Sequence, residues 1–150
     1  MKNLFNTTVA KEVIGRIESL TVKSTPKWGT MSASKMLAHC CVTYEMVYTN
    51  NYPRPNRLTR WILKKFIKNS VVSEKAYPKN IKTAAQFIIK NEPVFDTEKT
   101  RLIAFIKQTQ ALGATVFEGK DSHSFGNLTA NEWNVLFYKH LAHHLTQFGV

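Results

Sequence analysis

The chain has 150 residues, 43 % of them hydrophobic, and its 21 Lys and Arg against 10 Asp and Glu give a net charge of +11. A chain of this size is predicted to form a single domain, residues 1–150, with one buried core. No stretch approaches the about 20 apolar residues of a transmembrane helix. The first residues also lack the apolar segment of a secretory signal. We therefore expect a soluble, cytoplasmic protein.

The two cysteines, Cys40 and Cys41, are adjacent in the sequence. A disulfide between neighbouring residues is badly strained, so both cysteines are expected to be free thiols. Free thiols are typical of a reducing compartment such as the cytoplasm.

Apolar residues recur at helical spacing along the first half of the chain. Turn residues, including Pro53 and Pro55, separate the second predicted helix from a third, which is short and amphipathic. The three helices are predicted over Thr8 to Leu20, from an N-cap at Thr30 to about Tyr48, and over about Arg57 to Asn69.

The second half of the chain adds two long helices. Asp96 or Thr97 is predicted to cap one that ends at Gly113, and Thr129 with Glu132 matches the capping box that begins the other. Residues 70–93 have no clear period and are expected to form a loop with a helical turn at 82–89. Together the four long amphipathic helices predict an all-α fold, a four-helix bundle with a short extra amphipathic helix in the long connection.

The last predicted helix carries three of the five histidines, in the stretch YKHLAHH. On a helical wheel His140 and His144 lie in the middle of the apolar stripe, whereas His143 lies about 80° away at its edge. In the second helix His39 lies beside the most apolar face. Residues at i and i+4 have β-carbons about 5 to 6 Å apart. His140 and His144 can therefore bind one ion, and His39 can complete a three-histidine site with an open position.

Each of these histidines could instead be a core residue that is hydrogen-bonded to a carbonyl or a hydroxyl. A buried imidazole with incomplete partners costs about 1 to 3 kcal/mol, and a shared ion would remove that cost for all three. The motif is not the HExxH of metalloproteases, because Leu141 follows His140. Glu45 is expected to point away and Glu132 to cap its helix. A metal that activates its ligand without help from a carboxylate is therefore favoured.

Three other features of the sequence are candidate sites. The segment from Ser32 to Lys35 matches the SxxK of penicillin-recognising enzymes, but the chain lacks their SDN and KTG motifs. Cys40 is predicted to point inward, as a metal ligand, a nucleophile or simply a core residue. His123, in the loop KDSHSFGN, either folds over the open end of the site or is solvated.

A histidine in the second helix and HxxxH in the last, His39 with His140 and His144, resemble the DinB/YfiT superfamily of metal-dependent enzymes. The ending HSFGNLTANEWNVLFYKHLAHHLTQFG is most similar to an uncharacterised branch of it. The resemblance implies an up-down-down-up bundle, a homodimer, and a divalent ion, zinc or nickel, on these three histidines.

Characterised members of this superfamily include thiol S-transferases that use bacillithiol or mycothiol, and a mycothiol-dependent isomerase. In these enzymes the metal is thought to activate the thiolate of the cofactor. The resemblance therefore implies a metal-dependent enzyme, hydrolase-like or thiol S-transferase-like, in which the ion activates a water or a low-molecular-weight thiol. Its substrate is expected to be a small, anionic molecule.

Nine basic residues and a single acid, Glu74, lie between Arg54 and Lys82, and they account for +8 of the net charge of +11. The basic side chains of the short helix are predicted to lie on one arc and its apolar side chains on another: Arg57, Arg60, Lys64 and Lys68 against Leu58, Ile62, Leu63 and Phe66.

This basic segment has three interpretations. In the first, it is a solvated basic face that covers the end of the bundle. In the second, it is a rim that steers an anionic cosubstrate to the metal. In the third, the protein is a non-catalytic module with structural histidines that binds nucleic acid or an anionic membrane surface. Nucleic acid is disfavoured, because the chain contains no helix-turn-helix, zinc-finger or RNA-binding motif.

Overall fold

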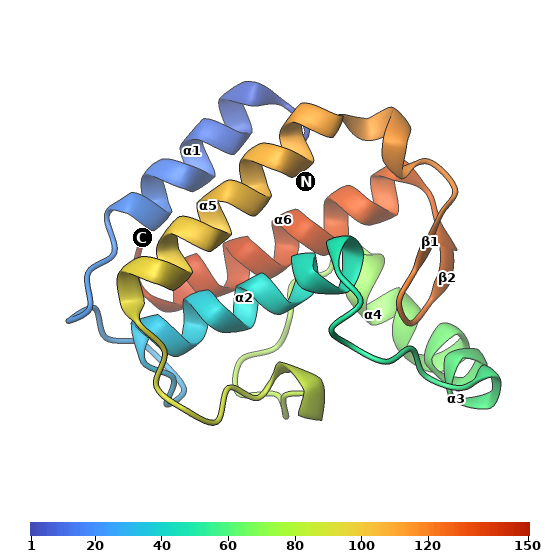
Figure 1. Ribbon diagram of the computed structural model, residues 1–150, viewed down its shortest axis with the longest axis horizontal. Helices are drawn as coiled ribbons and strands as arrows, with labels where there is room; N and C mark the ends of the chain where they lie inside the picture. The colour runs from blue at the N-terminus through green and yellow to red at the C-terminus, as the bar shows by residue number, and fades with distance from the viewer.

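In the computed structural model, which describes residues 1–150, four long helices pack around a shared core of 22 buried residues. They are α1 (Thr7–Glu18), α2 (Ala33–Tyr48), α5 (Phe95–Leu112) and α6 (Ala130–Gln147). Both α1 and α2 pack against α5 and against α6. Figure 1 shows that α1 and α6 run in one direction and α2 and α5 in the other. None of the helices has the length and apolar character needed to cross a membrane.

Side-chain caps explain where three of the long helices begin. Asn6 accepts a hydrogen bond from the amide of Thr8 and starts α1, and Thr129 with Glu132 forms the predicted capping box of α6. The predicted cap of α2 is wrong by two residues: Ser32, and not Thr30, accepts a hydrogen bond from the amide of Lys35. The reason is that a cap needs its oxygen near the amide of N2 or N3.

The helix α5 begins earlier than the capping residues predict. Its N-cap is Val94, which has no side-chain hydrogen bond, so the expected caps Asp96 and Thr97 lie inside the first turn. Phe95 is buried in the core, and this tertiary packing sets the start of the helix. Asp96 remains favourable there because carboxylates stabilise the positive end of the helix dipole. Gly113 ends the helix as predicted, with a φ of 73° that suits glycine.

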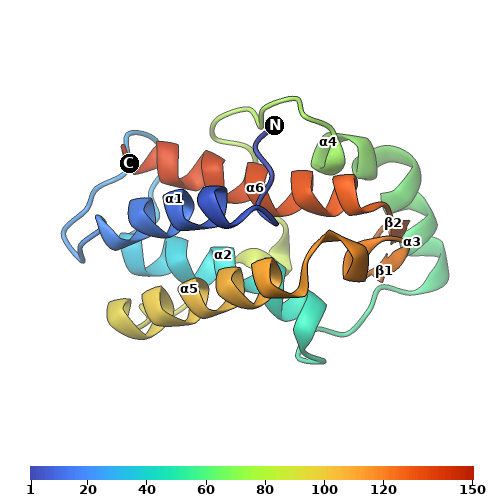
Figure 2. The ribbon, with the colours of Figure 1, turned by 90° about the horizontal axis from the view of Figure 1, so that it is seen from above.

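The long connection between α2 and α5 contains helical segments at two places. The predicted short helix is present as α3 (Arg57–Ile62), a π-helical segment (Leu63–Ile67) and α4 (Lys68–Val72). Near 82–89 only one 3₁₀ turn forms, at Ala85–Phe87. Figures 1 and 2 show α3 at one end of the molecule, beyond the four long helices.

The fold is mostly helical, but the all-α prediction was incomplete. After a 3₁₀ turn (Ala114–Phe117), the strands β1 (Lys120–Ser122) and β2 (Gly126–Leu128) form an antiparallel hairpin in which Lys120 pairs with Leu128. This stretch was expected to be a loop. Strands of three residues are too short to show the alternation of polar and apolar residues that identifies a strand in a sequence.

Candidate metal centre

Three histidines from two facing helices meet in the interior of the protein. His39 comes from α2, and His140 and His144 come from successive turns of α6. Potential metal-binding atoms of the three lie within 4.8 Å of one another, and the Nε2 atoms of His39 and His140 are 2.9 Å apart. His39 and His144 are buried and His140 is half-buried. The structure therefore brings together the three histidines that the helical wheels predict, and this group could hold a metal ion.

The outer nitrogen of every ring has a hydrogen-bond partner. Nδ1 of His39 lies 3.0 Å from the carbonyl oxygen of Phe87, and Nδ1 of His140 lies 2.9 Å from Oγ1 of Thr43. Nδ1 of His144 lies 2.8 Å from Oε1 of Gln147. Partners of this kind orient the histidines of metal sites, because they fix the ring and decide which nitrogen carries the proton.

These partners determine the tautomer of two rings. A carbonyl oxygen only accepts, so Nδ1 of His39 donates to Phe87. The amide nitrogen of Gln147 donates to the carbonyl of Trp28 at 2.7 Å, which directs its oxygen toward His144, and Nδ1 of His144 therefore donates as well. Neutral imidazole carries one proton. Nε2 of His39 and Nε2 of His144 consequently present lone pairs, which is the form that binds a metal.

His140 is the adaptable member of the group. Because Nε2 of His39 is an acceptor, the 2.9 Å contact between the two Nε2 atoms requires the proton to sit on Nε2 of His140. The hydroxyl of Thr43 then donates to Nδ1 of His140. A hydroxyl can also accept, so His140 can move its proton to Nδ1 and keep this partner. In that tautomer all three rings present a lone pair to the same space.

Burial keeps the three imidazoles neutral. It is the main cause that lowers the pKa of His39, of His140 and of His144, in the last case to about 3. Repulsion between the rings adds to the effect, since a proton on His39 or His144 disfavours a proton on His140. Metal binding requires deprotonated ligands. At neutral pH the three rings are therefore uncharged, and no proton has to leave a cationic ring before an ion binds.

The rings are close enough to share one tetrahedral ion if their side chains adjust, since the potential ligand atoms lie within 4.8 Å of one another. Their centroids are 4.6 to 4.9 Å apart. Two nitrogens bound to one tetrahedral ion at about 2.0 to 2.1 Å lie about 3.3 Å from each other. Nε2 of His39 and Nε2 of His140 would therefore separate by a few tenths of an ångström. Three imidazoles on one side of an ion leave a position for another ligand, as in catalytic zinc sites.

No carboxylate belongs to this group. As predicted, Glu45 is directed elsewhere: it forms an ion pair with Arg101 and accepts a hydrogen bond from Tyr52 at 2.9 Å. Glu132 caps α6 and pairs with Lys68 at 2.7 Å. A carboxylate general base like that of the HExxH proteases is therefore absent from the histidine group.

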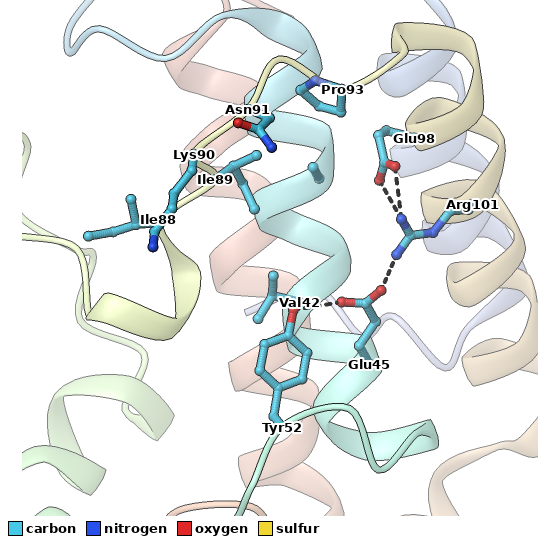
Figure 3. Close-up of a pocket in the computed structure, with 11 residues that line it drawn as sticks. Val42, Glu45, Tyr52, Ile88, Ile89, Lys90, Asn91, Pro93, Glu98 and Arg101 are labelled. Atoms are coloured by element: carbon cyan, nitrogen blue, oxygen red, sulfur yellow. Dashed lines mark hydrogen bonds and ion pairs between the residues drawn. The ribbon is translucent and has the colours of Figure 1, made fainter.

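Figure 3 shows where Glu45 points, into a pocket of about 380 Å³ between α2, α5 and the segment 88–93. Arg101 bridges Glu45 and the buried Glu98 there. None of the residues that line this pocket is a histidine. Its lining includes Ala38 and Ile88, the chain neighbours of His39 and Phe87. The pocket and the histidine group thus lie on adjacent faces of α2.

The remaining sequence candidates lie outside the group. His143 is half-buried and packs between the rings of Trp28 and Tyr77, whose centroids are 5.8 and 5.7 Å away. His123 lies at the hairpin with Nε2 3.1 Å from the carbonyl of Pro53, and it does not cover the site. Cys40 is buried, with Sγ 3.8 Å from the sulfur of Met36, which is core packing.

Sequence reasoning missed the residues that surround the three rings. The ring of Phe87 covers one side, with its centroid 5.4 Å from that of His39 and 6.0 Å from that of His140. Two partners had a usable sequence signal: Thr43 is one helical turn after His39, and Gln147 is three residues after His144. The carbonyl of Phe87 had none, because backbone groups carry no sequence pattern.

The fold and the site define a mostly helical protein with an interior histidine group that could hold a metal ion. The chain belongs to the family described as protein of unknown function DUF1569, which matches residues 2–149. Searches of curated proteins and of solved structures gave no match.

Proposed function

We propose that this protein is a metal-dependent enzyme in which His39, His140 and His144 hold a divalent ion, with zinc or nickel expected. One observation carries the proposal: Nδ1 of each of the three rings has its own hydrogen-bond partner, while potential ligand atoms of the rings lie within 4.8 Å of one another. A purely structural set of core histidines has no need for this convergence. The lowered pKa values keep the three rings uncharged, so they can bind a cation without electrostatic repulsion.

When bound, such an ion would lower the pKa of a water or thiol at its open position and so provide a nucleophile. The chain's own residues would orient the ion through the three rings, and Phe87 would restrict access of water from one side. The protein's cysteines do not suit the role of the thiol. Burial raises the pKa of Cys41 to about 12 and that of Cys40 well above its usual value. A reacting thiol would therefore come from a low-molecular-weight cofactor.

The resemblance to the DinB/YfiT superfamily supports this function. Its expected up-down-down-up order agrees with the directions of α1, α2, α5 and α6 in Figure 1. Its ligand pattern, one histidine in the second long helix and two in the last, agrees with the positions of the histidine group. On this basis we propose a single-domain, homodimeric, cytoplasmic enzyme of the hydrolase-like or thiol S-transferase-like kind, acting on a small anionic substrate.

Elemental analysis tests the metal site directly. Protein purified without a histidine tag and without chelators should contain close to one divalent ion per chain, and less than about 0.3 would contradict the proposal. Apoprotein reloaded with Co²⁺ then tests for an open position. A small thiol such as glutathione should add a thiolate-to-metal absorption band to the Co²⁺ spectrum. The control variant His143→Ala leaves all three ligands in place and should give the same band. A Co²⁺ spectrum that no thiol or anion alters would indicate a closed, structural site.

A further inference from the structure

The segment formed by α3 and the π-helical turn presents large apolar side chains to solvent. Leu58 is 68 % exposed, Trp61 55 % and Phe66 65 %, and Ile62 and Ile67 are exposed as well. These five residues, here called the apolar ridge, lie within ten positions of one another. Single exposed apolar residues are normal on a protein surface, but a cluster of this kind marks an interaction site.

The local helix geometry places the ridge on one side. Trp61 and Ile62 follow Leu58 by three and four residues, the spacing that shares a face of an α-helix. The next turn is π-helical, in which residues five apart become neighbours. Phe66 and Ile67 follow Trp61 and Ile62 by five, so the π-helical turn extends the same face.

The opposite side of this segment is fixed to the rest of the protein. Arg60 forms an ion pair with Asp121 of the hairpin at 2.6 Å and donates to the carbonyl of Ser122 at 3.0 Å. Lys68 pairs with Glu132 at the start of α6, and Val72 is buried in the core. The polar side makes the intramolecular contacts, and the apolar side faces outward.

The ridge is flanked by uncompensated positive charge. Arg57, Lys64 and Lys65 are exposed and take part in none of the salt bridges of the structure. Nζ of Lys65 lies over the rings of Trp61 and Phe66, 5.0 and 5.4 Å from their centroids. No acidic residue occurs between positions 51 and 73.

We propose that the apolar ridge and its flanking Arg57, Lys64 and Lys65 dock the protein on an anionic lipid surface. Apolar and aromatic side chains on one side, with Lys and Arg beside them, are the pattern of helices that lie in the membrane interface. The apolar residues enter the headgroup region while the cations meet the negative surface potential. Since no helix is able to cross a membrane, the attachment is peripheral.

The charges favour lipid over two other occupants. A second copy of the chain, docked through the same surface about a two-fold axis, would bring Arg57, Lys64 and Lys65 of both copies into one interface. Nucleic acid would satisfy the cations, but protein–DNA interfaces are polar and wet. Leu58, Ile62 and Ile67 offer no group that can hydrogen-bond to phosphates or bases.

Vesicle co-sedimentation tests the proposal. The wild type should bind vesicles of phosphatidylcholine and phosphatidylglycerol, bind phosphatidylcholine alone weakly, and dissociate in high salt. Trp61→Ser with Phe66→Ser, and separately Lys64→Gln with Lys65→Gln, should each reduce binding about tenfold or more. Lys11→Gln with Lys23→Gln removes the same charge from exposed positions elsewhere and should leave binding nearly unchanged. Unaltered metal content and circular dichroism confirm that the variants are folded.

A spectroscopic variant places the ridge in the lipid. Brominated acyl chains should quench part of the tryptophan fluorescence of the wild type, and Trp61→Phe should bind equally well but lose this quenching. Several results would overturn the proposal: no binding to anionic vesicles at low salt, or an equal loss in the Lys11 and Lys23 control. A dimer that Trp61→Ser with Phe66→Ser converts to monomer would assign the ridge to a second copy. DNA binding that needs Lys64 and Lys65 but not the ridge would assign the charges to nucleic acid.

Discussion

Thr43 and His140 face each other across the interface between α2 and α6, with Oγ1 of Thr43 2.9 Å from Nδ1 of His140. This hydroxyl is the one partner in the histidine group that can both donate and accept. Phe87 offers only a carbonyl and Gln147 only its amide oxygen, so they hold His39 and His144 in one tautomer. Thr43 therefore lets His140 change its tautomer when an ion binds.

Replacing Thr43 with Val should weaken metal binding while preserving the fold. Valine has nearly the same shape as threonine but leaves Nδ1 of His140 without its partner. Loss of such an outer hydrogen bond typically costs 10- to 100-fold in metal affinity, and we expect about that range here. Competition against a chromophoric chelator measures the change. Thr43→Ser keeps the hydroxyl and should stay within a fewfold of the wild type, whereas equal affinities for Val and Ser would mean that Thr43 plays no part.

Single substitutions of the histidines should distinguish the three metal ligands from the neighbouring His143. His140→Ala and His144→Ala should each abolish zinc uptake in calorimetric titration, and His39→Ala should do the same, because two remaining imidazoles bind an ion far more weakly. His143→Ala should retain uptake, since its ring packs between Trp28 and Tyr77 and lies outside the group. Similar losses in all four variants would show that the ligand assignment is wrong.

The convergence of the histidines could be predicted from the sequence, since it depends only on helix periodicity. His140 and His144 lie in the apolar stripe of a long helix with a clear capping box, and His39 lies beside the apolar face of another. Once both faces turn to one core, the three rings must lie close together. The same reasoning predicts that His143 is not a ligand, because it lies about 80° from the centre of the stripe.

The enclosure of the site could not be predicted in this way. Phe87 contributes its carbonyl and its ring from a segment with no period, and its position depends on how the chain crosses α2. The outward direction of the apolar ridge could not be predicted in this way either. Periodicity shows that Leu58, Ile62 and Phe66 share a face, but not which face is buried. That choice is made by the tertiary contacts of Arg60 and Lys68.

The metal-free protein should lose stability as the pH falls below about 6.5. The pKa of His144 is lowered to about 3, mainly by burial and then by the neighbouring His39, whereas an unfolded histidine titrates near about 6.5. Between these values the unfolded chain binds a proton that the folded chain does not, so protonation favours unfolding. The slope from His144 approaches about 1.4 kcal/mol per pH unit, and His39 and His140 act in the same direction.

Urea denaturation of the metal-free protein between pH 7 and pH 5 measures this effect. Most carboxylates stay ionised over that range, so they contribute little to the change in stability. His144→Gln cannot take up the proton and should show a shallower dependence on pH. Identical slopes for His144→Gln and the wild type would indicate that His144 is protonated in the folded protein. Saturating zinc should lower the pH at which the wild type unfolds, because the ion binds only the folded state.

Lys139 should contribute to stability through hydrogen bonds to the end of α4. It is 3 % exposed, and its Nζ donates to the carbonyls of Ser70, Ser73 and Lys75 at 3.0, 2.5 and 3.2 Å. Lys139→Met keeps most of the apolar stem but leaves these acceptors without their donor, so the free energy of unfolding should fall by about 1 to 3 kcal/mol. Chemical denaturation monitored by circular dichroism measures the loss. Lys107→Met makes the same replacement at an exposed site on α5 and should change stability by less than about 0.5 kcal/mol. Equal effects of the two substitutions would mean that the three carbonyls are satisfied by solvent and that Lys139 does not hold α4 against α6.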